Sequence, residues 1–139
     1  MEMVSFETKV ALLVREDLLA WQALNVAAFL ATGIAGADPA ALGAPYEDAA
    51  GRRYVPLLGQ PIMIYAATRP DLLKARRVAL ERGLTTAVYV AAMFTTGHDE
   101  ANRAAFHAEP AETPDLVGVA LRGPRKDVDK ATKGLRLHP

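Results

Sequence analysis

The sequence contains no cysteine, which excludes disulfide bonds, thiolate metal ligands and a cysteine nucleophile. Aromatic residues make up only 6% of the 139-residue chain. Ser5 is the only serine, and it lies before the first expected strand without the glycine-flanked frame of a serine hydrolase. Neither sign of charge is in excess, since sixteen basic residues balance sixteen acidic ones. Global charge therefore gives no reason to expect a nucleic-acid or membrane partner.

The start of the chain lacks the features of a secretory signal. Met1 is followed by Glu2 and Glu7, with no basic segment and no apolar core. The longest apolar stretch, 26–37, is too short to span a bilayer and is interrupted by Thr32 and two glycines. We therefore expect a cytoplasmic protein that makes no contact with a membrane.

What the chain does have is a regular alternation of apolar runs. Half of the residues are hydrophobic and 23% are charged, which is typical of one folded domain, here residues 1–139. Short apolar runs predict strands at 8–14, 61–66, 84–90 and 116–121, with an edge hairpin between 45 and 56. Helices are predicted at 18–31, 70–82, 98–107 and 125–133. Strands that alternate with helices favour an α/β fold, a three-layer α/β/α sandwich on a mixed, mainly parallel four-stranded sheet.

The first helix shows an apolar stripe at helical spacing. Leu18, Trp21, Leu24 and Ala28 recur every three or four residues, so we expect this stripe to face the sheet. Gly33 and Gly36 are expected to end the helix.

Several segments resemble a known bacterial family. They are residues 9–18, 21–26, 58–61 and 96–102, together with the closing segment 123–139, which is the most specific. These segments resemble the family known as domain of unknown function 2000, which has no established activity. The similarity covers nearly the whole chain.

A more distant resemblance concerns the order of elements. The strand that ends in Val14-Arg15-Glu16-Asp17-Leu18 and the closing segment around Gly123-Pro124 and Asp129-Lys130 look like those of type II peptidyl-tRNA hydrolases. This resemblance implies a four-stranded mixed sheet between helical layers, commonly in a homodimer. Where those enzymes carry a lysine and an aspartate, this chain has Asn25 and Ala91. Peptidyl-tRNA hydrolysis is therefore not expected, because the cation and the proton acceptor are both missing.

His98 is the most interesting single residue. It follows Gly97 in a polar loop, where an imidazole can act as a general acid or base, and Asp99 or Glu100 could fix its tautomer. Asp99 is also a candidate ligand-binding residue. The alternative is a residue at a helix start whose side chain bonds only to the backbone. Thr95 could position a substrate, or it could simply cap the next turn.

The other candidates are ligand-binding residues. Trp21 and Asn25 share a face of the first helix, and an amide beside an indole can orient a ligand. Gln60 could contact the ligand or only fix its own loop. Arg125 and Lys126 start a helix, where two cations oppose the helix dipole unless an anionic ligand or nearby acids offset them.

No metal or cofactor is expected. His98 and His107 are nine residues apart, which places them on opposite sides of a helix, and no nucleotide-binding fingerprint is present. Two hypotheses for function involve a site, and a third, a purely structural interaction subunit, stays open and would be favoured by exposed apolar surface. One is a module that binds a small or phosphate-bearing molecule where Asn25, Thr95, His98 and Arg125 converge at the carboxyl ends of the strands. The other is a hydrolase that uses His98.

Overall fold

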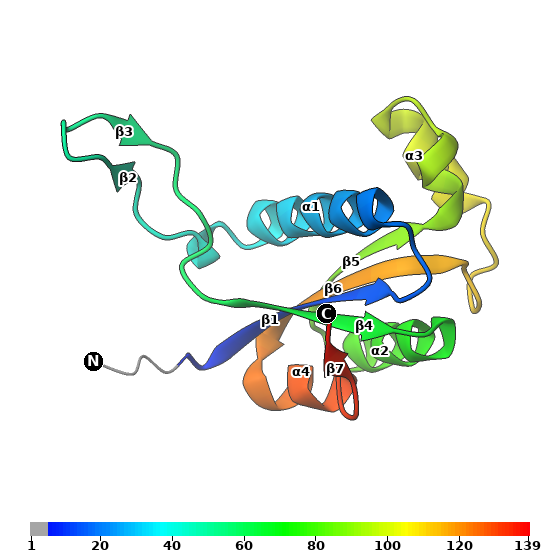
Figure 1. Ribbon diagram of the computed structural model, residues 1–139. Helices are drawn as coiled ribbons and strands as arrows, with labels where there is room; N and C mark the ends of the chain where they lie inside the picture. Colours follow the sequence, from blue (N-terminus) through cyan, green and yellow to red (C-terminus); the bar gives the residue numbers. More distant parts are fainter. Residues whose placement is uncertain (1–5) are drawn as a thin grey trace.

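The structure is a computed structural model that describes residues 6–139 (Figure 1). Ser5 and the first residues considered for a secretory signal lie outside this range. The helices are α1 (Ala20–Ala37), α2 (Arg69–Glu81), α3 (Asp99–His107) and α4 (Arg125–Ala131), with short 3-10 turns η1 (Pro39–Ala41) and η2 (Ala91–Thr95). The strands are β1 (Thr8–Arg15), β2 (Tyr46–Glu47), β3 (Arg53–Tyr54), β4 (Ile62–Ala67), β5 (Thr85–Val90), β6 (Leu116–Pro124) and β7 (Arg136–Leu137).

The main sheet has five strands in the order β5-β6-β1-β4-β7. β1 lies at its centre and is buried on both faces, as its continuous apolar run predicted. Only β1 and β4 are parallel, whereas β6 runs antiparallel to both β1 and β5, and β7 runs antiparallel to β4. The expectation of four strands in a mainly parallel sheet is therefore wrong: the sheet is mixed and mostly antiparallel.

The error has a physical origin in α3. A helix between two strands normally indicates a crossover that returns the chain to a parallel strand. Here α3 packs mainly against η2 at the end of β5, so the chain turns back and enters β6 from the same edge. An alternation of strands and helices cannot distinguish this arrangement from a crossover.

Helices cover both faces of the sheet (Figure 1). One core cluster lies under α1, where Val26, Leu30 and Ile34 pack on β1 and β6. The other lies under α2 and α4, where Leu72 and Val128 pack on the opposite face. The result is a three-layer α/β architecture.

Helix α1 departs from its prediction in two ways. It continues through Gly33 to Ala37, and the glycine lets the helix lie close to β5, since a Cβ atom at Gly33 would lie 3.2 Å from Cβ of Ala87. The expected stripe is also on the wrong face, since Trp21 and Leu24 are exposed. The helix has no charged residue, so its sequence does not mark which side faces water.

Candidate functional site

A broad, open cleft of about 1500 Å³ lies between α1, the end of β5 and α3. Figure 1 shows α3 standing beyond the amino end of α1, on the same side of the sheet. The strands β1, β4 and β5 all point toward this edge, since β1 and β4 are parallel and both β1 and β5 oppose β6. The cleft is therefore at the carboxyl ends of strands, where α/β proteins commonly bind ligands.

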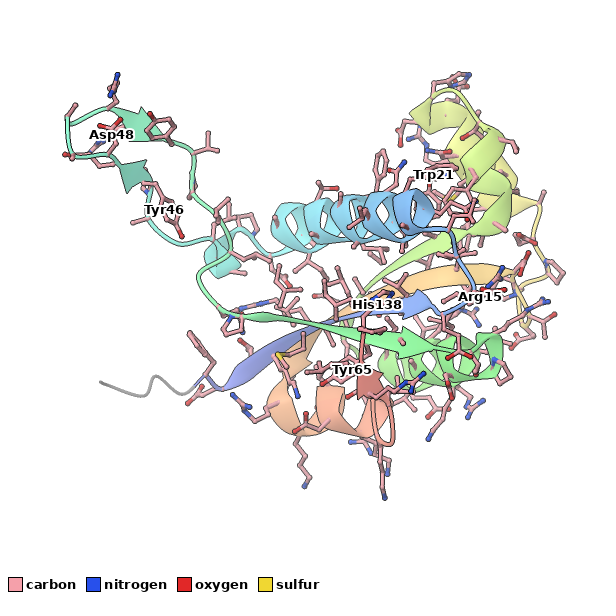
Figure 2. The ribbon with its side chains drawn as sticks, in the orientation of Figure 1. Arg15, Trp21, Tyr46, Asp48, Tyr65 and His138 are labelled. Carbon is pink, nitrogen blue, oxygen red and sulfur yellow. The ribbon has the colours of Figure 1, made fainter. Side chains whose placement is uncertain are left out.

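Aromatic side chains form the floor of the cleft. Trp21 meets Phe94 edge to face, with ring centroids 5.8 Å apart. Tyr89 lies 5.3 Å from Phe94 and 6.0 Å from Phe29 between ring centroids. The rings thus make one continuous apolar surface that extends from α1 to η2. Figure 2 labels Trp21, which stands at the α3 end of α1.

Tyr89 is the buried member of this group. Only 5% of its surface is exposed, and its burial raises the pKa of the phenol. The phenol therefore stays protonated throughout the physiological range and contributes a neutral wall.

Polar groups interrupt the aromatic surface. Asn25, one turn after Trp21 on α1, lines the cleft and is half-buried. Its amide makes no hydrogen bond to any other residue in the range 6–139 that the structure covers. The hydroxyl of Thr96 lies 2.9 Å from the carbonyl oxygen of Met93 and also contacts Asn102 of α3. The side-chain oxygen of Asn102 is therefore engaged, whereas the amide of Asn25 keeps both its oxygen and its NH2 group to orient a ligand.

His98 occupies the position before α3. Its Nδ1 accepts a hydrogen bond of 3.2 Å from the backbone N–H of Ala101, which makes it the N-cap of the helix. A neutral imidazole whose Nδ1 is an acceptor carries its proton on Nε2. His98 also lines the cleft, so it is a cap that retains one donor for a ligand.

Asp99 does not interact with the imidazole as expected. Its carboxylate forms an ion pair with Arg103, one turn later on α3. Both side chains line the cleft and both are largely exposed. This pair sits at the rim, in contact with solvent, where its electrostatic effect is screened.

Thr95 is not a wall of the cleft. Its hydroxyl donates a 3.0 Å hydrogen bond to the carbonyl oxygen of Ala92 and points into its own 3-10 turn. Thr96, its neighbour, lines the cleft instead. The structure therefore places Thr96, and not the predicted Thr95, on the cleft, a difference that depends on the exact end of η2.

The remaining predicted residues lie at the opposite end of the sheet. β6 runs antiparallel to β1, so Pro124 is paired with Thr8. The nine residues of β6 separate Arg125 from the cleft edge by about 30 Å. The expected convergence of Asn25, Thr95, His98 and Arg125 is therefore wrong.

Gln60 stabilises the start of β1. Its amide donates to the carbonyl oxygen of Thr8 at 3.0 Å, and its side-chain oxygen accepts from Thr8 and Arg122 at 3.2 Å each. Arg122 also lies 3.3 Å from a carboxylate oxygen of Asp38. Gln60 therefore fixes the loop before β4, and every polar atom of its amide is used by the fold.

The cations at the start of α4 also have structural partners or face water. The guanidinium of Arg125 donates to the carbonyl oxygen of Phe6 at 3.0 and 3.2 Å, while Lys126 is exposed. Asp127 and Asp129, in the same helix, pair with Arg82 and Lys9 at 2.6 and 2.7 Å. Arg125 is thus used by the backbone, and the two aspartates are used by cations outside α4.

Within residues 6–139 there is no group of three metal-ligating side chains. His98 and His107 both line the broad cleft, although they are half a turn apart in phase on α3. The neutral surface of rings and amides, rather than a cluster of charges, is the feature that defines this site.

Sequence reasoning missed Tyr89, Phe94, Thr96 and Asn102. The strand at 84–90 was predicted, but not which of its faces meets α1. On that face lie Ala87 and Tyr89, while Val88 and Val90 face the other core. Alternation along the strand defines two sets of residues, and both sets are apolar, so the sequence does not distinguish the face toward α1 from the opposite face.

The comparisons agree with this architecture. A model of the family described as "Protein of unknown function (DUF2000)" matches residues 8–139. The structure of Atu0240, a protein of unknown function from Agrobacterium tumefaciens strain C58, is similar, with 47% sequence identity and a TM-score of 0.92. The similarity covers 97% of this chain and 100% of that one. A search of curated proteins gives no match. The chain therefore belongs to the DUF2000 family of proteins of unknown function.

Proposed function

We propose that the protein binds a small, uncharged, ring-bearing molecule in the cleft between α1 and α3. The observation that supports this most directly is the free amide of Asn25 beside the rings of Trp21 and Phe29. Ligand sites are mainly apolar with a few well-placed polar groups, and this cleft has that composition. The amide of Asn25 and the Nε2–H of His98 would supply the directional contacts.

Charge argues against a phosphate-bearing ligand here. The first turn of α3 carries Asp99 and Glu100, which oppose an anion at that helix start. Arg103 is paired with Asp99, and Arg76 donates to the carbonyl oxygen of Ala111 at 2.7 Å. The two cations that favoured phosphate in the sequence lie at the other end of the sheet.

A hydrolase is the second candidate, because His98 and Asn25 line the same cleft. The resemblance to type II peptidyl-tRNA hydrolases would place the missing lysine and aspartate at Asn25 and at Ala91, which begins η2 directly after β5. We propose this resemblance as one of fold. A general base needs a free lone pair, and the Nδ1 of His98 is already an acceptor. Binding is therefore favoured over hydrolysis.

A neutral fluorescent probe, N-phenyl-1-naphthylamine, tests the proposal. Trp21 is the only tryptophan, so a ligand in the cleft should quench its emission and accept its excitation energy. We expect saturable binding that weakens about fivefold in Asn25→Ala, the loss of about one hydrogen bond. Phe29→Ala should weaken it further, and Lys126→Ala, at the opposite end of the sheet, should leave it unchanged.

The alternatives give different results in the same series. Protection of the protein by inorganic phosphate, lost in Arg103→Ala, would favour an anionic ligand and contradict the neutral one. Hydrolysis of 1-naphthyl acetate that disappears in His98→Ala would favour the hydrolase. Binding of the probe that is equal in Asn25→Ala, Phe29→Ala and the unaltered protein would overturn the proposal.

A further inference from the structure

The outer face of α1 is unusually apolar for a surface helix. None of its eighteen residues is charged, and only Val26, Leu30 and Ile34 are buried. The opposite side exposes Leu24, which is 73% accessible, and Ala28. A helix that is hydrophobic on all sides is normally covered on all sides. This face is thus expected to meet something other than water.

Exposed hydrophobic side chains gather on this side of the molecule. Eleven large ones are exposed among the described residues, and all but Leu80 and Leu137 lie on α1 and its N-cap, on the β2–β3 hairpin and the segment after it, or on α3. If each exposes about 100 Å², these nine present about 900 Å². A standard interface buries about 800 Å² on each partner. The apolar area is therefore that of a protein–protein contact.

The shape of this side is a saddle. Figure 1 shows the hairpin rising beyond the carboxyl end of α1 and α3 rising beyond its amino end. The eighteen residues of α1 place these two projections about 27 Å apart. One projection is an apolar arm, and the other borders the apolar cleft. The two ends of the saddle are thus complementary to each other but too far apart to meet within one chain.

The β2–β3 hairpin with the segment after it, residues 46–57, is here called the arm. Hydrogen bonds hold its turn, but it has no hydrophobic core of its own. The carboxylate of Asp48 accepts from the N–H groups of Ala50 and Arg52 at 2.9 and 3.0 Å and from the hydroxyl of Tyr54 at 3.0 Å. At the base, Gly43 donates to the carbonyl oxygen of Leu57 at 2.8 Å. A two-stranded hairpin is marginally stable in water by itself, yet this one exposes more than half of Tyr46 and Tyr54. Figure 2 shows Tyr46 and Asp48 on this projection, away from the sheet.

We infer that two copies of the chain pair through this saddle. A two-fold axis across the middle of α1 would set the two α1 helices antiparallel, with the small side chain of Ala28 near the axis. The same operation carries the hairpin of each copy to the α1–α3 cleft of the other, so that Tyr46 and Tyr54 cover the mouth of that cleft. An isologous interface requires one surface to complement itself in this manner.

Charge at the two ends of the saddle does not oppose a second copy. On the arm Arg52 pairs with Asp48 and Arg53 with Glu47, and on α3 Arg103 pairs with Asp99. Pairing would therefore bring together two ends whose charges are largely neutralised within each copy. The floor between them has no charge to repel its copy.

A membrane is a weaker candidate for the occupant. By length and composition α1 could cross a bilayer, with a mean hydropathy of 1.2, but it packs Val26, Leu30 and Ile34 into the core of the sheet. A helix that lies on a membrane surface is usually flanked by basic residues. The residues that flank this face are instead paired acids and bases, Arg52 with Asp48, Arg53 with Glu47 and Arg103 with Asp99, which leave no basic excess.

The size of the cleft fits a shared site. About 1500 Å³ exceeds the roughly 300–1000 Å³ of an ordinary ligand pocket, which leaves room for an arm above a small molecule. This closing role rests on the proposed ligand, whereas the pairing of the chains does not.

Sedimentation velocity of the full chain tests the pairing. We expect a dimer with a dissociation constant of about 1 μM or tighter, as interfaces of this size give. Ala28→Glu should weaken it at least about a hundredfold, because two carboxylates would face each other at the axis. Leu80→Glu, at an exposed leucine on α2, is the matched control and should leave the dimer intact.

Cross-linking tests the arrangement, since the chain has no cysteine of its own. Val55→Cys on the arm and Ala104→Cys on α3 would be made in separate chains and mixed. A short cross-link between the two different chains is expected to form more readily than either self-link. If two Val55→Cys chains cross-link to each other as readily as a Val55→Cys chain cross-links to an Ala104→Cys chain, the arms lie together and the antiparallel pairing is contradicted.

The outcomes separate the two proposals. A monomer that binds the naphthylamine probe would overturn the pairing and leave the proposed function standing. A dimer that binds no probe would overturn the proposed function and leave the pairing standing. A monomer that sediments with phosphatidylcholine vesicles would assign the α1 face to a membrane and overturn the pairing. In a dimer that binds, Val55→Asp should weaken both self-association and probe affinity.

Discussion

Helices α1 and α2 cover opposite faces of one sheet, and they differ in the residues that they expose to water. On α2 the buried residues Leu72, Ala75 and Val78 alternate with exposed Lys74 and Arg77. On α1 the buried residues alternate with further apolar ones, and no charge appears in eighteen residues. The α2 side is therefore amphipathic, whereas the α1 side leaves apolar residues exposed to solvent.

The helix ends show the same contrast. The hydroxyl of Thr68 accepts from the N–H of Asp71, whose carboxylate accepts in turn from the N–H of Thr68, at 3.3 and 2.9 Å. At the start of α1 the N-cap is Leu19, which has no side-chain oxygen, and no acidic residue lies in the first turn. Local sequence thus stabilises α2 by itself, while α1 depends on packing against the sheet and, in our proposal, against a second copy.

The largest expected effects come from the buried sides of the two helices, where the comparison predicts no difference. Ile34→Ala on α1 and Leu72→Ala on α2 each remove a fully buried side chain. Each should lower the free energy of unfolding by about 2–5 kcal/mol, through lost burial and the cavity left behind. Urea denaturation measures both. A cost under about 1 kcal/mol for Ile34→Ala alone would show that α1 is only loosely attached to the sheet.

Two glycines on β6 give a sharper test of how closely each face is packed. A methyl group at Gly118 would lie 2.4 Å from Cγ1 of Val26 and 2.9 Å from Cδ1 of Leu30, both on α1. A methyl group at Gly123 would lie 2.4 Å from Cδ2 of Leu84, the end of a flexible side chain. Val26 is β-branched and fixed on its helix, so it cannot turn away.

We therefore expect Gly118→Ala to destabilise the protein by about 1–3 kcal/mol and Gly123→Ala to cost clearly less. Thermal unfolding of the two variants, measured in parallel, checks the order. Equal costs would mean that α1 can move away from the sheet as easily as one leucine can change its rotamer.

The sequence predicted well the parts of the fold that depend on local pattern. The continuous apolar run of β1 indicated a central strand, and the turn residues between 45 and 56 indicated the hairpin. It could not indicate the direction of β6, because α3 resembles a crossover in sequence and only its contacts show otherwise. The buried face of α1 was also beyond local pattern, since Leu24 and Leu30 look alike without a charge nearby.

For the site, the outcome of the predictions depends on the same two features, the buried face of α1 and the direction of β6. Trp21, Asn25 and His98 lie on one cleft because α1 and α3 meet at the carboxyl end of β5. Arg125 and Lys126 follow β6, and because β6 runs antiparallel to β1 they lie at the far end of the sheet. The direction of this one strand therefore separates both cations from the cleft.

The smallest expected effect is a pH dependence of local stability that differs between the arm and the α4 side of the sheet. Backbone and side-chain hydrogen bonds, the N–H of Arg52 first, lower the pKa of Asp48 in the arm. On the α4 side, the hydrogen bond to Asp129 raises the pKa of Lys9. A lowered carboxyl pKa stabilises the folded arm above the ordinary aspartate value of about 3.9, and the effect disappears as the pH falls through the lowered value.

A raised lysine pKa has the opposite sign. Its stabilisation is complete below the ordinary value of about 10.4 and disappears as the pH rises through the raised one. Acid should therefore loosen the arm first at the amides of Ala50 and Arg52, and alkali should loosen the contact between β1 and α4. Amide protection factors from hydrogen exchange followed by NMR can resolve the acid end, with Asp48→Asn expected to remove the acid transition in the arm, and thermal unfolding against pH can resolve the alkaline end. If the protection factors of the arm amides are equal at neutral and acid pH, the Asp48 turn is not what orders the hairpin, and burial of the arm against a second copy is left as its source of order.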